Sequence, residues 1–273
     1  MTDHPLRREI ITTVAVNRFV NSQGISSYHR LSSDTGASGA DIIRAQLTAR
    51  SIFRVGALEV GLRRESLDSG TFVALMVSMR HLVERGTRWV LQTLGTAIDV
   101  AQAVETFAGP SREVLNNVEH VATPKVVESW TRRRDELVAQ GLSPDLARLL
   151  AAEPIAHLAP AIVLIASRSS HDLFDTARRF FEVRDRLELG RFFEAAEALP
   201  RTDRWSLMAQ AAIVDELLAV QAALGAEAVS GAFDGARPDL ERIAPLLSDL
   251  ALDGADLGRL SVAVRLLRSL VKG

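Results

Sequence analysis

Apolar residues recur along this chain at intervals of three and four, the spacing that places them on one face of an α-helix. No segment combines the period-two alternation and the hairpin signals of a β-strand pair. The pattern therefore predicts an all-α protein, a multi-helix array of about a dozen helices joined by short turns, with a looser stretch near residues 230–237. The clearest apolar stripe comprises Trp205, Met208, Ala212, Ile213, Leu217, Val220 and Leu224.

Residues that begin and end helices occur at regular places in this pattern. At 123–124 and 143–144 a hydroxyl side chain precedes a proline that can occupy the first helical position. Ser38 and Asp41 have the spacing of a capping box, and the pair 202–203 offers Thr202 or Asp203 as a further N-cap. The glycines expected to end helices are Gly24, Gly36, Gly141, Gly190 and Gly225.

A faint internal repeat has a constant spacing of 134 residues. Both copies follow the order of polar cap, helix, glycine and second helix, which helical punctuation alone can also produce. A true duplication predicts two similar helical halves, residues 1–110 and 111–233, followed by a C-terminal helical tail at 234–273. The matched pairs are Ser38 and Asp172, Asp41 and Asp175, Arg50 and Arg184, Phe53 and Leu187, Val55 and Leu189, Gly56 and Gly190, and Leu58 and Phe192.

The segment DTGASGADIIRA at 34–45 looks at first like a phosphate-binding turn or an esterase nucleophile motif. A dinucleotide turn must follow a buried strand, but the polar segment SSYHRLSSD precedes Thr35. Both motifs also need a glycine at position 40, where this chain has alanine. We therefore interpret the segment as a helix start, with Gly36 ending one helix and Ser38 capping the next.

Composition limits the classes of function further. The 273 residues have a formal net charge of −2, which gives no basic footprint for nucleic acid. Without cysteine, the chain has no disulfide, thiolate zinc site, iron–sulfur cluster or cysteine nucleophile. The longest apolar run, 159–166, is too short to span a bilayer. We expect a cytoplasmic protein with neither nucleic acid nor membrane as a partner.

Candidate catalytic and metal-binding groups are not found at useful spacings. None of the six histidines has a partner at metal-ligand spacing, so no metal site is expected. The three arginines at 132–134 precede Asp135 and Glu136, and a pair between Arg132 and Glu136 favours a solvated helix face over a phosphate site. We predict no catalytic, cofactor-binding or metal residue in this chain.

Five residues are instead candidates for an interface with another domain. On a helix starting at Leu6, the apolar residues share a sector with Asn17 and Asn21, and buried asparagines need hydrogen-bond partners. Those partners can lie within this domain or in another domain or subunit. Arg88 and Trp89 form a pair common at interfaces, although a core tryptophan beside a surface arginine is also common. Arg44 completes the candidate set.

Three motifs together identify a family resemblance. They are HPLRREIITT with VNRFVNSQG at 4–24, TGASGADIIRA at 35–45 with downstream Arg50 and Phe53, and ALPRTDRWSLMAQAA at 198–212. Their order and spacing, together with RWVLQ at 88–92, resemble the C-terminal helical region of the large bacterial NAD-specific glutamate dehydrogenases. The resemblance covers about residues 4–229. The chain departs from it at Gln46, where an aromatic is usual, and in the polar stretch at 26–30.

The resemblance implies that the full enzyme uses NAD to oxidise L-glutamate to 2-oxoglutarate and ammonia. The catalytic lysine and the nucleotide-binding fold lie upstream in that family, so Met1 is expected to mark a fragment, a split gene or a truncated gene model. The expected partners are the catalytic domain of the same enzyme and, in the full protein, further copies of it. A stand-alone helical interaction module is the alternative, and an independent enzyme requires distant Asp, His and Arg residues to converge.

Overall fold

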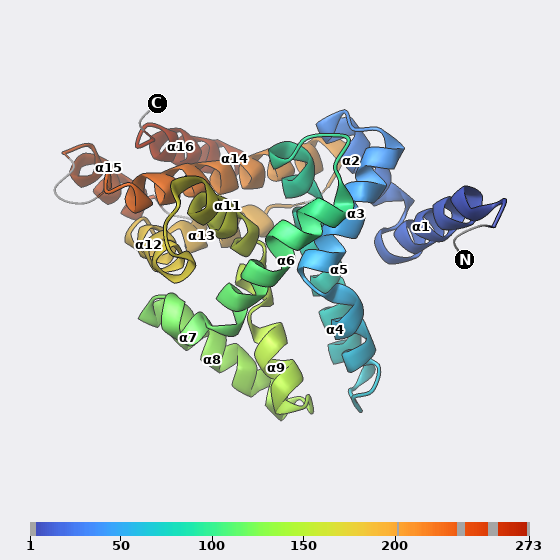
Figure 1. Ribbon diagram of the computed structural model, residues 1–273. Coiled ribbons are helices and arrows are strands. Elements are labelled where there is room, and N and C mark those ends of the chain that lie inside the picture. Colours follow the sequence, from blue (N-terminus) through green and yellow to red (C-terminus); the bar gives the residue numbers. More distant parts are fainter. Residues whose placement is uncertain (1–3, 201, 234–237, 251–255, 272–273) are drawn as a thin grey trace. The chain divides into compact units, whose positions relative to one another are not determined.

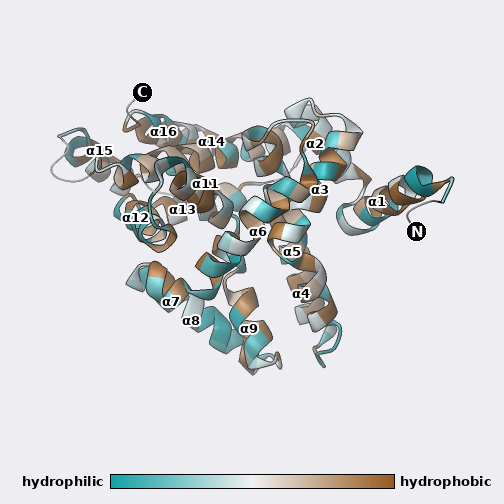
Figure 2. Cartoon of the chain, in the orientation of Figure 1, coloured by the Kyte–Doolittle hydropathy of each residue, from teal (hydrophilic) through white to brown (hydrophobic). Residues whose placement is uncertain are grey.

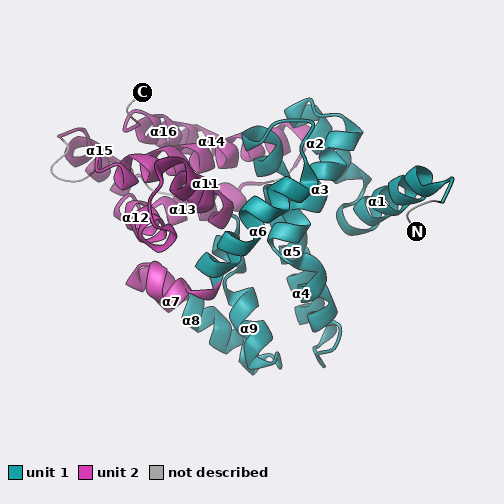
Figure 3. Ribbon diagram, viewed as in Figure 1, with its two compact units in different colours: residues 1–115, 130–157 teal, residues 116–129, 158–273 magenta. Residues whose placement is uncertain are grey.

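The computed structural model describes residues 4–200, 202–233, 238–250 and 256–271, and every regular element among them is helical (Figure 1). The expected all-α class is confirmed. The chain forms two compact units, shown in Figure 3. Unit 1 comprises residues 1–115 and 130–157, and unit 2 comprises residues 116–129 and 158–273. A duplication predicts a different division, into halves at 1–110 and 111–233 and a tail at 234–273. That division stays a prediction.

The helices of the two units are connected by short turns. Unit 1 holds α1 (Arg7–Gln23), α2 (Ile25–Thr35), α3 (Gly39–Ile52), α4 (Val55–Leu62), α5 (Ser69–Thr93), α6 (Val100–Asn116), α9 (Pro144–Ala151) and α10 (Glu153–Ala156). Unit 2 holds α7 (Val118–Val121), α11 (Ala159–Ser169), α12 (Leu173–Arg186), α13 (Leu189–Glu197), α14 (Arg204–Val229), α15 (Pro238–Ser248) and α16 (Leu257–Arg268). The helix α8 (Pro124–Ala139) contributes to both.

Local sequence signals place the helix starts correctly. Ser38 is the N-cap of α3 and accepts a hydrogen bond from the Asp41 backbone N–H, and Asp203 is the N-cap of α14. Asp203 and Ser206 form a reciprocal capping box, which satisfies backbone N–H groups that the first helical turn leaves unpaired. The helices α8 and α9 begin at their prolines, as residues 123–124 and 143–144 predict.

The glycine signals are only partly reliable. Gly24, Gly36 and Gly141 adopt positive φ beside helix ends, as expected. Gly190 instead is the second residue of α13, and Gly225 lies within α14, so both predicted helix ends are wrong. Gly225 is explained by packing rather than by a turn, because a methyl group there would meet the ring of Phe180.

Two four-helix series follow the same plan at a constant offset. The helices α2, α3 and α4 begin at Ile25, Gly39 and Val55, and α11, α12 and α13 begin 134 positions later at Ala159, Leu173 and Leu189. The long helices α5 and α14 follow in each series, and the same helix pairs pack together in both. Even the left-handed residues that separate the second and third helices correspond: Arg54 has a φ of 53° and Glu188 has a φ of 50°.

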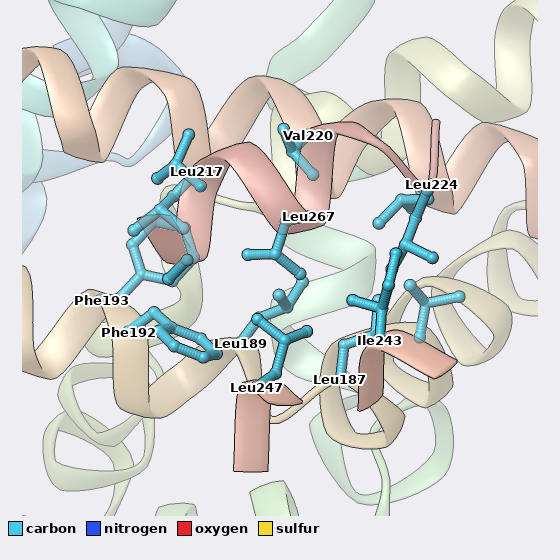
Figure 4. Close-up of a cluster of buried hydrophobic side chains, with 14 of the residues drawn as sticks. Leu187, Leu189, Phe192, Phe193, Leu217, Val220, Leu224, Ile243, Leu247 and Leu267 are labelled. Atoms are coloured by element: carbon cyan, nitrogen blue, oxygen red, sulfur yellow. The ribbon is translucent and has the colours of Figure 1, made fainter. Parts of the chain in front are cut away.

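The long helix α14 forms the centre of the unit 2 core, in which it contacts α11, α12, α13 and α16 (Figure 4). It is also long and apolar enough to cross a membrane, and the bent pair at 144–151 and 153–169 passes the same test of length and composition. Ile213, Leu217, Val220 and Leu224 of its predicted stripe are buried. Trp205 is 73% exposed and lies outside this core.

Candidate interaction surface

The most buried carboxylate of unit 1 belongs to a structural network. Glu153 of α10 accepts a 2.5 Å hydrogen bond from Ser78 of α5 and lies 3.5 Å from Arg85 and 3.4 Å from Arg133. At 132–134 Arg132 is exposed as expected, whereas Arg133 is only partly exposed and reaches Glu153, a partner 20 residues away. Among the residues that the structure describes, no group of three or more His, Asp or Glu side chains could hold a metal ion.

Arg88 and Trp89 point into unit 1. The Arg88 guanidinium donates a 2.6 Å hydrogen bond to the Asp34 carboxylate, and only 8% of Arg88 is exposed. Trp89 packs edge-on against Phe107 of α6, with ring centroids 5.3 Å apart. The surface arginine expected beside a core tryptophan is thus a buried ion pair, and both residues connect helices of the same unit.

Asn17, Asn21 and Arg44 lie on the surface of unit 1. Arg44 forms a 2.9 Å ion pair with Asp41 of the same helix. The apolar face of α1 is itself open: Ile11 and Val14 are among its exposed side chains, and Figure 2 shows apolar turns within this helix. The asparagines therefore do not satisfy a buried apolar face, and α1 leaves that face available for a partner.

An open cleft of about 870 Å³ lies between α1, α3, α4 and α5 of unit 1. Asn21 is one of the residues that line it. Three valines at the cleft are exposed although they are apolar: Val60 by 50%, Val73 by 57% and Val77 by 43%. Phe72 and Met76 extend this apolar lining along α5. The cleft therefore offers a continuous apolar lining that unit 1 does not cover.

The cleft is also basic. Among the described residues Glu59 is the one acidic residue in its lining. Five arginines also line it, namely Arg18, Arg50, Arg54, Arg63 and Arg80. The charge of Arg50 is neutralised by a bidentate ion pair with Glu59, with N–O distances of 3.1 and 2.8 Å. Arg80 donates to the backbone carbonyl of Gln23 at 2.5 Å. The guanidinium groups of Arg18, Arg54 and Arg63 make no ion pair with the described part of the chain.

Sequence reasoning found one residue of this surface, Asn21, and missed the cleft itself. The lining residues come from four helices, so their proximity depends on the packing of those helices. A short segment of the sequence contains no information about that packing. The one local signal was the exposed valine pattern of α5, where Val73 and Val77 are four residues apart and thus share a helix face.

The regular elements of the described residues are all helices, which defines the chain as an all-helical module. The family model described as "Glutamate dehydrogenase, C-terminal" matches residues 1–269. The chain therefore belongs to the family of glutamate dehydrogenase C-terminal regions, as the three sequence motifs indicate.

Similar proteins show how small a part of them this chain represents. The NAD-specific glutamate dehydrogenase of Halomonas elongata is 30% identical over 250 residues, which cover 91% of this chain and 15% of the relative. That of Mycobacterium tuberculosis is 27% identical over 292 residues, covering 98% of this chain and 17% of the relative. That of Pseudomonas aeruginosa is 29% identical over 223 residues, which cover 80% of this chain and 14% of the relative. The chain spans about a sixth of these curated relatives.

Proposed function

We propose that this chain is the C-terminal helical module of a large NAD-dependent glutamate dehydrogenase and that it acts structurally or in regulation. The full enzyme oxidises L-glutamate to 2-oxoglutarate and ammonia with NAD as the cofactor. The module itself supplies no catalytic or NAD-binding residue. Its partners are the catalytic part of the same enzyme and, in the assembled protein, further copies of that enzyme, all in the cytoplasm.

The family match over residues 1–269 carries this proposal. The surface of unit 1 supports it, because the exposed face of α1 and the open cleft are the kind of apolar surface that a larger protein covers. The titratable groups support it as well: the buried Glu153 and Arg88 are held by ion pairs within unit 1, which is the arrangement of a scaffold rather than of a reaction centre.

A complementation assay tests the proposal. The Halomonas elongata enzyme is produced without the region that this chain matches, and NADH formation is followed with glutamate after adding this chain or, as a positive control, the relative's own C-terminal region. We expect this chain to bind the truncated enzyme and raise its activity, and to form no NADH alone. Glutamate-dependent NADH formation by the pure chain would contradict its non-catalytic role.

A stand-alone helical interaction module is the second candidate, and the open apolar face of α1 is the observation that favours it. In that case the chain leaves the truncated enzyme unchanged while the positive control restores activity. The coding sequence immediately upstream of this chain distinguishes the two candidates independently, because only the first expects the catalytic part there.

A further inference from the structure

A surface that is covered by further helices in unit 2 is open at the equivalent helices of unit 1. In unit 2 the apolar surface of α13 and α14 is covered by α15 and α16, which contribute Ile243, Leu247 and Leu267 to the shared core (Figure 4). In unit 1 the corresponding surface beside α4 and α5 is the open cleft. The comparison uses the constant offset of 134 positions between the two helix series.

Equivalent positions establish the correspondence residue by residue. Val55, Glu59 and Val83 line the cleft, and their counterparts Leu189, Phe193 and Leu217 belong to the covered core of unit 2. The cleft residues Met79 and Arg80 likewise correspond to Ile213, which is buried in that core, and Val214, which packs against it. The buried residues at the base of the cleft thus correspond to residues of the core that α15 and α16 help to form in unit 2.

Two charges at this surface are reversed between the units, whereas Arg50 corresponds to another arginine, Arg184. The cleft residues Arg54 and Arg63 correspond to Glu188 and Glu197 in unit 2. The helix α16, which packs against α13 and α14, carries Arg259, Arg265 and Arg268 and no acidic residue between Leu257 and Arg268. Arg268 approaches Glu216 of α14 to within 3.9 Å. Glu188 itself pairs with Arg191 of its own helix, so the acidic residue that α16 approaches is Glu216.

We propose that the cleft of unit 1 accepts an acidic amphipathic helix from the remaining polypeptide of the glutamate dehydrogenase. Its apolar face covers Val60, Val73 and Val77, and its carboxylates face Arg54 and Arg63, as an amphipathic helix does when it docks in an apolar groove. This inference rests on the proposed function, because the matched relatives are about six times longer than the aligned region and can supply such a segment.

Photo-crosslinking tests where the occupant lies. A photoreactive amino acid replaces Val73 or Val77, and matched controls replace Val138 or Leu149, which are exposed in unit 1 by 40% and 42% but do not line the cleft. Each variant is mixed with the truncated Halomonas elongata enzyme. We expect cross-links from positions 73 and 77 to one acidic helical segment of that enzyme. Association with cross-links only from the control positions, or to a second copy of this chain, overturns the inference.

Charge reversal tests the role of the arginines. The double variant Arg54→Glu, Arg63→Glu is compared with Arg64→Glu, whose exposed side chain does not line the cleft. At low salt we expect the double variant to bind the truncated enzyme at least 10-fold more weakly and the control to bind normally, with thermal unfolding showing that both remain folded. Equal binding by all three proteins overturns the inference.

Two further outcomes separate the alternatives. If inorganic phosphate or malonate raises the unfolding temperature of the chain in a manner that requires Arg54 and Arg63, and binding to the truncated enzyme does not depend on them, the cleft is a site for small anions and the inference fails. If the chain does not bind the truncated enzyme while the positive control does, the proposed function fails as well. Binding without cross-links from the cleft removes only the inference.

Discussion

Gly225 of α14 lies directly against the ring of Phe180 of α12: a methyl group at position 225 would stand 2.5 Å from the Phe180 Cδ2 atom. Phe180 is 1% exposed, so its ring has no room to move away. The helices α12 and α14 thus approach each other closely at a residue that has no side chain. Gly86 of α5 plays the same part in unit 1, where Phe53 and Ala49 lie beside it.

The substitution Gly225→Ala is expected to destabilise the protein. Overpacking of a filled core costs about 1–3 kcal/mol, which exceeds the gain of about 1 kcal/mol that alanine brings to a helix interior. Gly56→Ala is the matched control, because position 56 is helical and has nothing within 4 Å of the added methyl group. It should stabilise the protein by about 0.4–1 kcal/mol. Urea unfolding measures both, and equal stability of the two variants contradicts the packing argument.

Glu153→Gln is expected to weaken unit 1. The neutral amide keeps the shape of the side chain but removes the charge that faces Arg85 and Arg133. Loss of a partner for partly buried charged groups costs about 1–3 kcal/mol. Glu128→Gln, on the exposed face of α8, should change the free energy of unfolding by less than about 0.5 kcal/mol. An unfolding midpoint in urea that is the same for both variants would show that the Glu153 network is not stabilising.

The ion pair between Asp34 and Arg88 gives a prediction about coupling. Both side chains are 10% exposed, so solvent screens their interaction weakly. In a double-mutant cycle with Asp34→Ala and Arg88→Ala, we expect a coupling free energy of about 1–3 kcal/mol. The pair Arg44 and Asp41, in which Arg44 is 45% exposed, should give a much smaller coupling. Additive effects of the two substitutions at 34 and 88 would contradict the prediction.

Stability should fall in acid partly through the caps. The pKa of Asp203 is lowered by the hydrogen bond from the Ser206 backbone N–H, and the pKa of Asp68 is lowered by Thr71. A folded pKa below the unfolded value of 3.8 means that this contribution is present above that value and is lost as the pH falls through the folded pKa.

The caps can be separated from other acid effects by comparing Asp203→Asn with Asp203→Ala. Asparagine is also a good N-cap but does not titrate. The unfolding temperature of the natural chain should therefore approach that of Asp203→Ala as the pH falls below 3.8, while Asp203→Asn keeps a constant difference from Asp203→Ala. A constant difference between the natural chain and Asp203→Ala would exclude a role for this carboxylate in acid unfolding.

Local signals in the sequence predicted local structure. Ser38, Asp203 and the prolines at 124 and 144 mark helix starts because capping needs only the neighbouring backbone. Gly225 was misread as a helix end because its partner, Phe180, is 45 residues away. Information about tertiary contacts is required to distinguish a glycine that turns the chain from one that admits a neighbouring ring.

The candidate site was predictable only in outline. The periodicity placed Asn21 on a helix face with apolar neighbours, but the same periodicity also placed Trp205 on a buried stripe, where it does not lie. Burial of a helix face depends on whether another helix covers it. The residues of α1 and of the start of α14 do not by themselves show whether such a covering helix exists. The family motifs at 4–24 and 198–212 were informative because their order and spacing extend over most of the chain and not over one helix.

The covering of the unit 2 groove by α16 has a consequence for quality control in the cell. Since α16 is part of the same chain, unit 2 can close at any protein concentration. Under the inference above, unit 1 instead needs a segment from outside these 273 residues: for a separate chain, an occupant present at 100 times its dissociation constant adds about 2.7 kcal/mol. A copy without its partner then displays Val60, Val73 and Val77 to chaperones and proteases, whereas an assembled copy hides them. Filling of the cleft would therefore change how much apolar surface the protein presents to solvent.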